Sequence, residues 1–131
     1  MNVLAIDPGD TTGIFASSGS HHVQMTEFHV IDYLERLHDD SPIEHVVMER
    51  FNLYDKRSKA NAGWALNVIG AVTYWCWDAA VPLTLQWNRD KNQVSDKMLE
   101  DKGMLIKPKH KWRHANDAAR HYVYWQTRNG R

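Results

Sequence analysis

Cysteine is almost absent from this sequence, and long apolar runs are absent altogether. The single cysteine, Cys76, excludes an intrachain disulfide. With no histidine pair at ligand spacing on one element to join it, that cysteine also argues against a zinc site. No apolar stretch approaches the ~20 residues that span a bilayer, and no basic segment precedes the apolar run that begins at Val3. We therefore expect a cytoplasmic protein with no membrane partner.

Neither sign of charge is in excess, but the charges are unevenly distributed along the chain. Residues 1–55 hold ten acidic residues against two basic ones, whereas residues 56–131 hold fourteen basic residues against six acidic ones. A basic half of this size favours nucleic-acid binding, although the solvated faces of ordinary globular proteins also carry such runs. The hydrophobic fraction of 43% is typical of a globular protein, and the 131 residues are expected to form a single domain.

The spacing of apolar residues predicts five strands and four helices. The predicted strands cover residues 3–6, 13–16, 22–30, 45–48 and 81–85. The predicted helices cover residues 31–39, 60–80, 94–99 and 114–127. In the longest helix, Leu66, Ile69, Thr73 and Cys76 keep helical spacing and are expected to face the core. This order of elements predicts an α/β fold with a five-stranded mixed sheet flanked by helices on both faces.

Three carboxylates and one histidine stand at positions where such a fold builds a site. Asp7 follows the first predicted strand and Glu49 follows the fourth, while Asp117 and His114 lie three apart on the final helix. Ends of neighbouring parallel strands meet at one edge of a sheet, and residues three apart share one helix face. Carboxylate oxygens from two strands and a helix are ligands suited to Mg²⁺ or Mn²⁺.

Each of these residues also has an ordinary structural interpretation. The segment after Asp7 continues with Pro8 and Gly9, which is common turn chemistry. Glu49 is compatible with a charged residue that simply leaves a strand, and Asp117 with an acid stabilised by the dipole at a helix N-terminus. The remaining histidines are scattered and are interpreted as surface residues.

Residues 5–13, 46–51 and 114–119, in that order along the chain, resemble the motifs of RuvC Holliday junction resolvases, of the RNase H-like superfamily. The short chain and the basic run at residues 107–114 look more like phage-encoded members, which would place the protein in the cytoplasm of a bacterial host. Residues 5–13 resemble the family's opening strand and turn, residues 46–51 its second motif, and residues 114–119 its closing helix. The resemblance implies that Asp7, Glu49, His114 and Asp117 are the catalytic residues and ligands of two Mg²⁺ or Mn²⁺ ions. It further implies hydrolysis of phosphodiester bonds in branched DNA, with a 5′-phosphate and a 3′-hydroxyl as products, by a homodimer on the junction.

Binding of DNA is expected from the basic half and from aromatic residues beside the second motif. Lysine and arginine confer affinity through phosphates, and aromatic rings stack on unpaired bases. The long helix carries Trp64, Trp75 and Trp77, and an aromatic patch formed by those that do not enter the core is a candidate for part of the dimer interface. The candidate nucleic-acid-binding residues are Phe51, Tyr54, Lys56, Arg57, Lys59, Arg89, Lys91, Lys107, Lys109, Lys111 and Arg113.

Other classes of protein remain compatible with parts of the pattern. Residues 6–13 also resemble the phosphate-binding loop of actin-like kinases and ATPases, which need two such domains and therefore a longer chain. A nuclease of the same fold that cuts flaps, forks or RNA–DNA hybrids would carry the same carboxylates. A non-catalytic module that binds branched DNA would have no reason to gather them.

Overall fold

The computed structural model describes residues 1–50 and 62–130, and its described part contains one five-stranded sheet. The strand order is β3-β2-β1-β4-β5. The strands are β1 (Val3–Asp7), β2 (Thr11–Ala16), β3 (His21–Thr26), β4 (His45–Glu49) and β5 (Leu83–Gln86). The helices are α1 (Val30–Asp40), α2 (Ala62–Asp78), α3 (Asn88–Lys91), α4 (Asp96–Asp101) and α5 (Arg113–Arg128), with a 3-10 turn at Glu27–His29.

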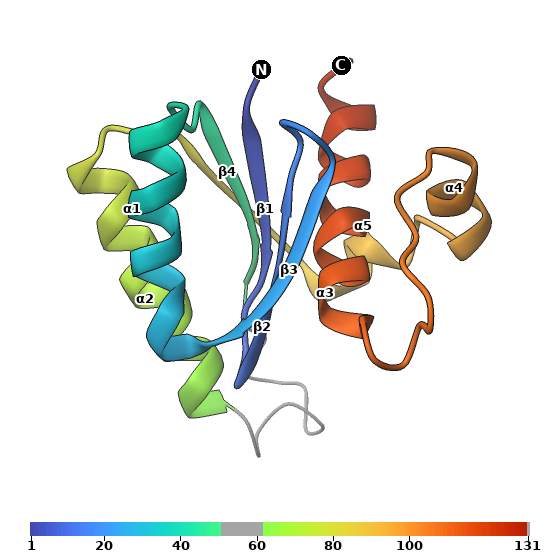
Figure 1. Cartoon of the computed structure of the whole chain (residues 1–131), viewed down its shortest axis with the longest axis horizontal. Coiled ribbons are helices and arrows are strands. Elements are labelled where there is room, and N and C mark those ends of the chain that lie inside the picture. The colour runs from blue at the N-terminus through green and yellow to red at the C-terminus, as the bar shows by residue number, and fades with distance from the viewer. Residues whose placement is uncertain (51–61, 131) are drawn as a thin grey trace.

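Helices cover both faces of the sheet (Figure 1). The α1 and α2 helices lie together on one face, and α5 lies on the other, with α3 and α4 on the same side as α5. The expected α/β class, five-stranded mixed sheet and two-sided helical cover are confirmed. No helix among the described residues is long and apolar enough to cross a membrane.

The register of the central strands determines which residues meet at the edge of the sheet. Strand β1 runs antiparallel to β2, where Asp7 faces Gly13, and parallel to β4, where Ile6 faces Met48. Strand β4 is parallel to β5, where Glu49 faces Gln86. The carboxyl ends of β1, β4 and β5 therefore lie at one edge, and the last residues of β1 and β4 are the two acids expected there.

Alternation along the buried strands gives each face its own core. Leu4 and Ile6 of β1 belong to the cluster on the α1 and α2 face, whereas Val3 and Ala5 belong to the cluster beneath α5. Successive side chains of a strand point to opposite faces, so a strand covered on both sides is apolar throughout. Asp7 continues the alternation and points to the α5 face.

Two sequence expectations about element boundaries and faces were wrong. The third strand ends at Thr26 and not at Val30, because Val30 is the first residue of α1 and is buried there one turn before Leu34. The inward face of α2 is the row of Ala65, Val68, Val72, Trp75 and Cys76.

If the expected row faced the core, α2 would be rotated about its axis by about one residue from its observed orientation. Of the four expected residues, Cys76 is buried and Ile69 packs against the core as predicted, whereas Leu66 is 45% exposed and Thr73 is exposed, so these two do not belong to the core. The observed orientation buries the indole of Trp75, whose Nε1 donates a hydrogen bond to Glu35 of α1 over 3.0 Å. A large ring with a satisfied N–H buries more apolar area than a leucine does, which favours this rotation of the helix.

Candidate active site

Two carboxylates lie side by side at the carboxyl edge of the sheet. Asp7 is the last residue of β1 and is 5% exposed, and Glu49 is the last residue of the adjacent parallel strand β4. Both acids follow apolar strand residues that are completely buried, so the sheet core fixes where their backbones end. The ordinary interpretation of Glu49, a charge leaving a strand for solvent, does not describe its partly buried position.

A glycine allows the final helix to approach this edge. Gly13 of β2 faces Asp7 of β1, and a Cβ atom added to Gly13 would overlap the carbonyl group of His114 at the start of α5. The first turn of α5 therefore rests directly on the backbone of β2. Gln24 of β3, which faces Gly13, accepts a hydrogen bond from Ala115 N and donates one to Lys111 O, over 3.0 and 2.9 Å.

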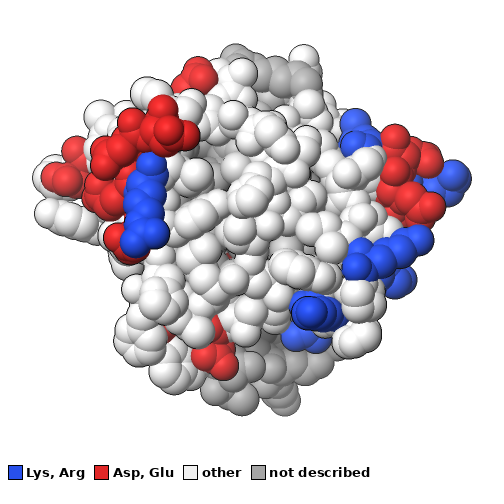
Figure 2. Space-filling model, viewed as in Figure 1, with Lys and Arg blue, Asp and Glu red and all other residues white. Residues whose placement is uncertain are grey.

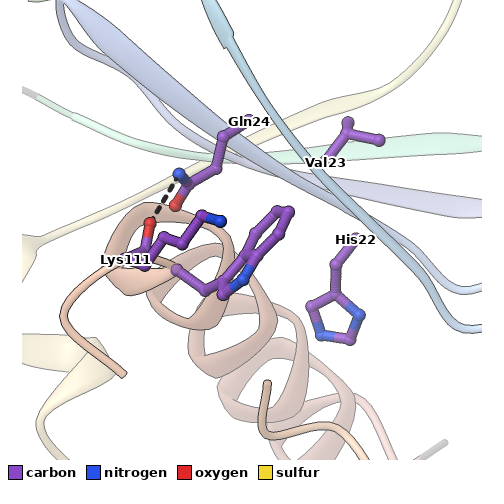
Figure 3. Close-up of a pocket in the computed structure, with 5 residues that line it drawn as sticks. His22, Val23, Gln24 and Lys111 are labelled. Carbon is purple, nitrogen blue, oxygen red and sulfur yellow. Dashed lines mark hydrogen bonds between the residues drawn. The ribbon is translucent and has the colours of Figure 1, made fainter. Parts of the chain in front are cut away.

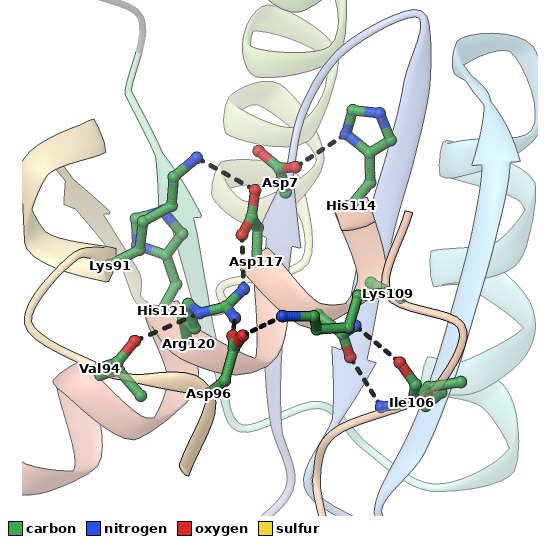
Figure 4. Close-up of polar contacts among 12 residues, drawn as sticks. Asp7, Lys91, Val94, Asp96, Ile106, Lys109, His114, Asp117, Arg120 and His121 are labelled. Carbon is green, nitrogen blue, oxygen red and sulfur yellow. Dashed lines mark hydrogen bonds and ion pairs between the residues drawn. The ribbon is translucent and has the colours of Figure 1, made fainter. Parts of the chain in front are cut away.

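Because α5 approaches the sheet so closely, His114 and Asp117 lie at the same edge as the strand carboxylates (Figure 4). The Nδ1 atom of His114 lies 3.1 Å from Oδ2 of Asp7. Asp117, one turn further along, points toward the same space, and the charges of Glu49 and Asp117 both act on Asp7. The structure thus gathers all four residues that the sequence identified as catalytic.

Lys91 lies between two of these carboxylates. Its Nζ atom is 3.0 Å from Oε1 of Glu49 and 3.3 Å from Oδ2 of Asp117, and its side chain is only 16% exposed. The sequence had suggested Lys91 as a contact for nucleic acid from the loop after the fifth strand. It is instead the last residue of α3, and it neutralises part of the acidic cluster.

Arg120 holds Asp117 from the other side. Its Nη1 atom lies 2.8 Å from Oδ1 of Asp117, its Nη2 pairs with Asp96, and its Nε donates to the backbone oxygen of Val94 over 3.2 Å. Asp96 in turn accepts a hydrogen bond from Lys109 over 2.6 Å. A guanidinium with all three contacts made has little rotational freedom, so Arg120 fixes the rotamer of Asp117.

His121 supports Glu49 in a similar way. This histidine is completely buried, which corrects its interpretation as a surface residue. The amide nitrogen of Gln86 lies 3.0 Å from the backbone oxygen and 2.9 Å from Nδ1 of His121, and an amide nitrogen can only donate. Nδ1 is therefore the acceptor, and Nε2 carries the hydrogen that points to Oε1 of Glu49 over 3.0 Å.

The environment separates the proton affinities of the two strand carboxylates. Burial raises the pKa of Asp7 above its ordinary value, and the hydrogen bond with His114 offsets only part of this effect. Burial alone would also raise the pKa of Glu49, but the hydrogen bond from His121 and the charge of Lys91 lower it below its ordinary value. Burial alone would lower the pKa of Lys91, but the carboxylates of Asp7, Glu49 and Asp117 raise it above its ordinary value. Such divergent environments are typical of functional sites.

The ligand chemistry of the site fits a divalent cation. Three carboxylates are hard oxygen ligands of the kind that Mg²⁺ and Mn²⁺ take, and the imidazole of His114 adds one nitrogen of intermediate softness. Among residues 1–50 and 62–130, no three such side chains lie close enough to hold one ion as they stand. The Lys91 ammonium contacts the oxygens of Glu49 and Asp117 that an ion would use. Binding of an ion therefore requires this ammonium to move.

The basic residues expected to contact DNA lie mainly on the surface. Lys107, Lys109, Lys111 and Arg113 are all exposed in the segment that leads into α5. Arg89 is exposed on α3, with its guanidinium 5.9 Å from the ring centroid of Trp87. Five further candidates lie outside the described residues: Phe51, Tyr54, Lys56, Arg57 and Lys59.

The uneven charge of the sequence becomes a separation in space (Figure 2). Acidic side chains gather over the α1 side of the molecule, where Asp32, Glu35, Asp39 and Asp40 are carried by one helix. Basic side chains gather over the opposite side, among the elements around α4 and the start of α5, with a few acids between them. The basic surface and the carboxylate cluster thus share the α5 side of the sheet.

Comparison with known proteins gives a match in structure and none in sequence. No protein-family profile matches the chain, and no curated protein matches it. Solved structures do match, and two of them align almost end to end. RuvC of T. thermophilus in complex with a Holliday junction substrate has a TM-score of 0.71 at 18% identity, covering 99% of this chain and 96% of that one. The Thermus thermophilus RuvC structure has a TM-score of 0.69 at 18% identity, covering 99% and 97%.

The chain has the RuvC fold. The fold resemblance to RuvC that the three sequence motifs carried is therefore confirmed over nearly the whole chain. The RuvC-like core supplies the strand ends for Asp7 and Glu49 and the helix for Asp117.

Sequence reasoning missed the residues that surround the carboxylates. Arg120 and His121 follow Asp117 by three and four residues, so the helical spacing that joined His114 to Asp117 also placed them on or beside the same face. That spacing was the available signal. No comparable signal indicated the contacts of Lys91 and Asp96, because α3 and α4 are too short for a periodic pattern. Gln86 is the last residue of β5, and its place beside Glu49 follows from the pairing of β4 with β5.

Proposed function

We propose that this protein is a metal-dependent, structure-specific endonuclease that cleaves Holliday junctions and related branched DNA. The observation that carries the proposal is the convergence of Asp7, Glu49 and Asp117 at the carboxyl edge of a RuvC-like sheet. The basic segment 107–113 leads directly into the first turn of α5, which carries His114 and Asp117, so a phosphate backbone bound there passes close to the carboxylates. The RuvC structure solved with a Holliday junction supports a branched DNA as the substrate.

The chain's own residues divide the work of the proposed reaction. Asp7, Glu49, Asp117 and His114 would hold two Mg²⁺ or Mn²⁺ ions. When bound, such ions promote in-line attack of water on phosphorus and neutralise charge on the departing 3′ oxygen, leaving a 5′-phosphate and a 3′-hydroxyl. Arg120 and His121 orient Asp117 and Glu49 through the hydrogen bonds described above. Lys91 balances the negative charge of the cluster, and exposed lysines and arginines bind phosphates.

We further propose that two copies of the chain act together on one junction. A four-way junction presents two symmetric strands for cleavage, so a two-fold assembly matches it. The outer surface of α2 supports this, because Trp64, Tyr74 and Trp77 are 40%, 65% and 76% exposed. Phe28, 77% exposed, lies with its ring centroid 6.3 Å from that of Trp64 and extends the aromatic surface. Light scattering of the protein with and without a junction tests the assembly, and a single copy per junction contradicts it. The cytoplasm of the producing cell is the expected compartment.

The decisive experiment is cleavage of a labelled, immobile four-way junction with Mg²⁺ or Mn²⁺. The Asp7→Asn variant keeps the shape of the side chain and loses its charge, so cleavage should fall by at least a thousandfold while the protein stays folded. Asp10→Asn is the matched control, because Asp10 is an exposed acid of the same turn outside the site. Chelation of the metal should stop cleavage by the wild type, and DNA ligase should reseal the products.

Each outcome decides between specific functions. Paired cuts in opposing strands that are lost in Asp7→Asn support the resolvase. Cleavage of forks, flaps or RNA–DNA hybrids but not of junctions would show that the protein is a nuclease with a different substrate. Equal cleavage by wild type and Asp7→Asn would remove Asp7 from the site. Binding of junctions without cleavage of any substrate would indicate a non-catalytic binding module.

A further inference from the structure

A cavity lies between the edge strand β3 and the segment that enters α5. It is lined by His22, Val23, Gln24, Lys111 and Trp112 and has a volume of about 310 Å³. Cavities of about 300–1,000 Å³ accommodate small molecules or parts of larger ones. None of the five lining residues belongs to the carboxylate cluster, so the cavity needs a separate explanation.

The walls of this cavity are held in place by hydrogen bonds. Gln24 reaches from β3 to the backbone of Lys111, as Figure 3 shows, and its amide oxygen accepts from Ala115 N. His22 donates from Nε2 to the backbone oxygen of Met104 over 2.8 Å, and its ring lies edge-on to Phe15 at 4.8 Å between centroids. The cavity is therefore formed before any ligand enters, which reduces the entropy lost on binding.

The lining combines an aromatic plane with a positive charge. Trp112 is partly exposed and contributes an indole ring, and Lys111 is exposed with its Nζ atom 6.0 Å from the centroid of that ring. An indole stacks on a nucleobase of any sequence, and an adjacent ammonium attracts a phosphate. This pairing of groups matches one nucleotide, with its base on the ring and its phosphate at the lysine.

The register of the sheet gives the distance from the cavity to the carboxylates. Asp7 faces Gly13, and Gly13 faces Gln24, so two strand spacings separate Asp7 from the cavity wall. Neighbouring strands lie about 4.8 Å apart, which makes this separation about 10 Å. Stacked nucleotides of one strand advance about 3.4 Å each, so a DNA strand crosses this distance in about three nucleotides.

We propose that the cavity beside Trp112 and Lys111 holds an unpaired nucleotide of the bound DNA strand, within about three nucleotides of the cleaved phosphate. This inference rests on the proposed function and specifies what the enzyme recognises at a branch point. Bases at a branch point are unpaired or easily unpaired, whereas bases in a duplex stay stacked on their neighbours. Occupation of the cavity would thus favour branched DNA over a duplex without reading sequence.

The test measures the affinity of the full chain for a fluorescent immobile junction in EDTA, where no cleavage occurs. Loss of a base-stacking contact costs about tenfold in affinity, so Trp112→Ala should bind about tenfold more weakly. Trp112→Phe keeps an aromatic plane and should stay within about threefold of the wild type. Circular dichroism melting checks that both variants are folded at the assay temperature.

A second set of DNA substrates separates loss of stacking from a general loss of structure. Junctions carrying an abasic site at single positions within four nucleotides of the branch are compared. At one of these positions the missing base should weaken binding of the wild type but not of Trp112→Ala. Lys111→Gln should lower the slope of log affinity against log salt by about one, whereas Lys97→Gln, an exposed lysine of α4, should leave it unchanged.

The outcomes distinguish this inference from the proposed function. If Trp112→Ala binds the junction as tightly as the wild type, the cavity inference is overturned while cleavage by the wild type keeps the resolvase. The inference is equally overturned if Trp112→Ala remains as sensitive as the wild type to every abasic site. If the wild type neither binds nor cleaves branched DNA, the proposed function fails and the cavity inference fails with it.

Discussion

On one face of the sheet, α1 and α2 contact the strands almost entirely through hydrocarbon, whereas on the other face α5 contacts them through hydrocarbon and a hydrogen-bonded polar network. Four of the five buried polar residues of the described chain lie on the α5 side: Asp7, Gln86, Asn116 and His121. Asn116 takes part in both kinds of contact, since it is buried in the core and its side chain exchanges two hydrogen bonds with the backbone of Ile106.

The difference shows that the two faces have separate tasks. A helix held by dispersion and the hydrophobic effect tolerates small shifts, because these forces have no strong directional preference. Hydrogen bonds and ion pairs do have such a preference, and an error of about 1 Å misplaces a catalytic group. We therefore expect substitutions on the α1 and α2 face to change stability alone and substitutions on the α5 face to change both stability and cleavage.

The largest expected effect on stability comes from Leu34→Ala on the α1 helix. Leu34 is completely buried in the core beneath α1 and α2, and truncation of such a leucine costs about 3 kcal/mol of unfolding free energy. Urea denaturation measures the loss. Cleavage per folded molecule should stay at the wild-type rate at a temperature where both proteins are folded. A variant that is folded but inactive would show that the two faces are not independent.

Gly13→Ala is expected to cost a similar amount of stability and to damage cleavage as well. The new methyl group would overlap the backbone carbonyl of His114, which is no flexible side-chain end, so α5 must move away from β2, at a cost of about 3 kcal/mol. Because this shift separates His114 and Asp117 from Asp7, the cleavage rate should fall at least tenfold. Gly70→Ala in α2 is the matched control, since nothing lies within 4 Å of the added methyl, and it should stabilise the protein by about 1 kcal/mol. Wild-type cleavage by Gly13→Ala would show that the close approach is not needed.

Lys91→Met examines the charge balance of the α5 face. Its ammonium contacts the same carboxylate oxygens that a cation would bind, so its removal should strengthen binding of Mn²⁺ by roughly tenfold, a change of about 1.4 kcal/mol. The metal-free variant should melt at a lower temperature, because three carboxylates lose their central positive charge. Titration calorimetry and thermal melting measure the two effects. Unchanged Mn²⁺ affinity would mean that the ammonium does not compete with the ion.

The smallest expected effect belongs to Asp96→Asn. The hydrogen bond from Lys109 and the charge of Arg120 hold the pKa of Asp96 below its ordinary value of about 3.9. A lowered folded-state pKa contributes stability above pH ~4 that disappears as the pH falls through the lowered value. The wild type should therefore melt slightly above Asp96→Asn at pH 7, and the difference should be smaller at pH 3.

Asp101→Asn, which breaks an exposed pair with Lys97, serves as the control for Asp96→Asn at both pH values. The control should leave the melting temperature almost unchanged. A melting difference between wild type and Asp96→Asn that is undiminished at pH 3 would contradict the assigned role of the Asp96 charge.

Much of this architecture could be predicted from the sequence, for reasons that differ between residues. Asp7 and Glu49 each follow an apolar strand, and strand ends converge by geometry, so local pattern located them. His114 and Asp117 required only helical spacing. The contacts of Lys91 and Asp96 depend instead on how the short elements α3 and α4 fold back over α5, and no local pattern encodes that path.

The rotation of α2 was predicted wrongly for a related reason. Two neighbouring rows of its surface are both apolar, and only contact with Glu35 and the α1 helix selects the row that contains Trp75. His121 shows the same limit, because its burial follows from Gln86 and Glu49 on two strands. Tertiary contacts decide such cases, and periodicity alone cannot.

The separation of acidic and basic surfaces has a consequence for the rate of encounter with DNA. The chain carries no net charge, so a polyanion exerts almost no attraction on it from afar, but it does exert a torque on the charge separation. The molecule turns its α1 surface away and arrives with the start of α5 leading, which raises the fraction of collisions that are productive. Ions at physiological strength screen this torque beyond about 8 Å, so alignment occurs only in the last layers of water before contact.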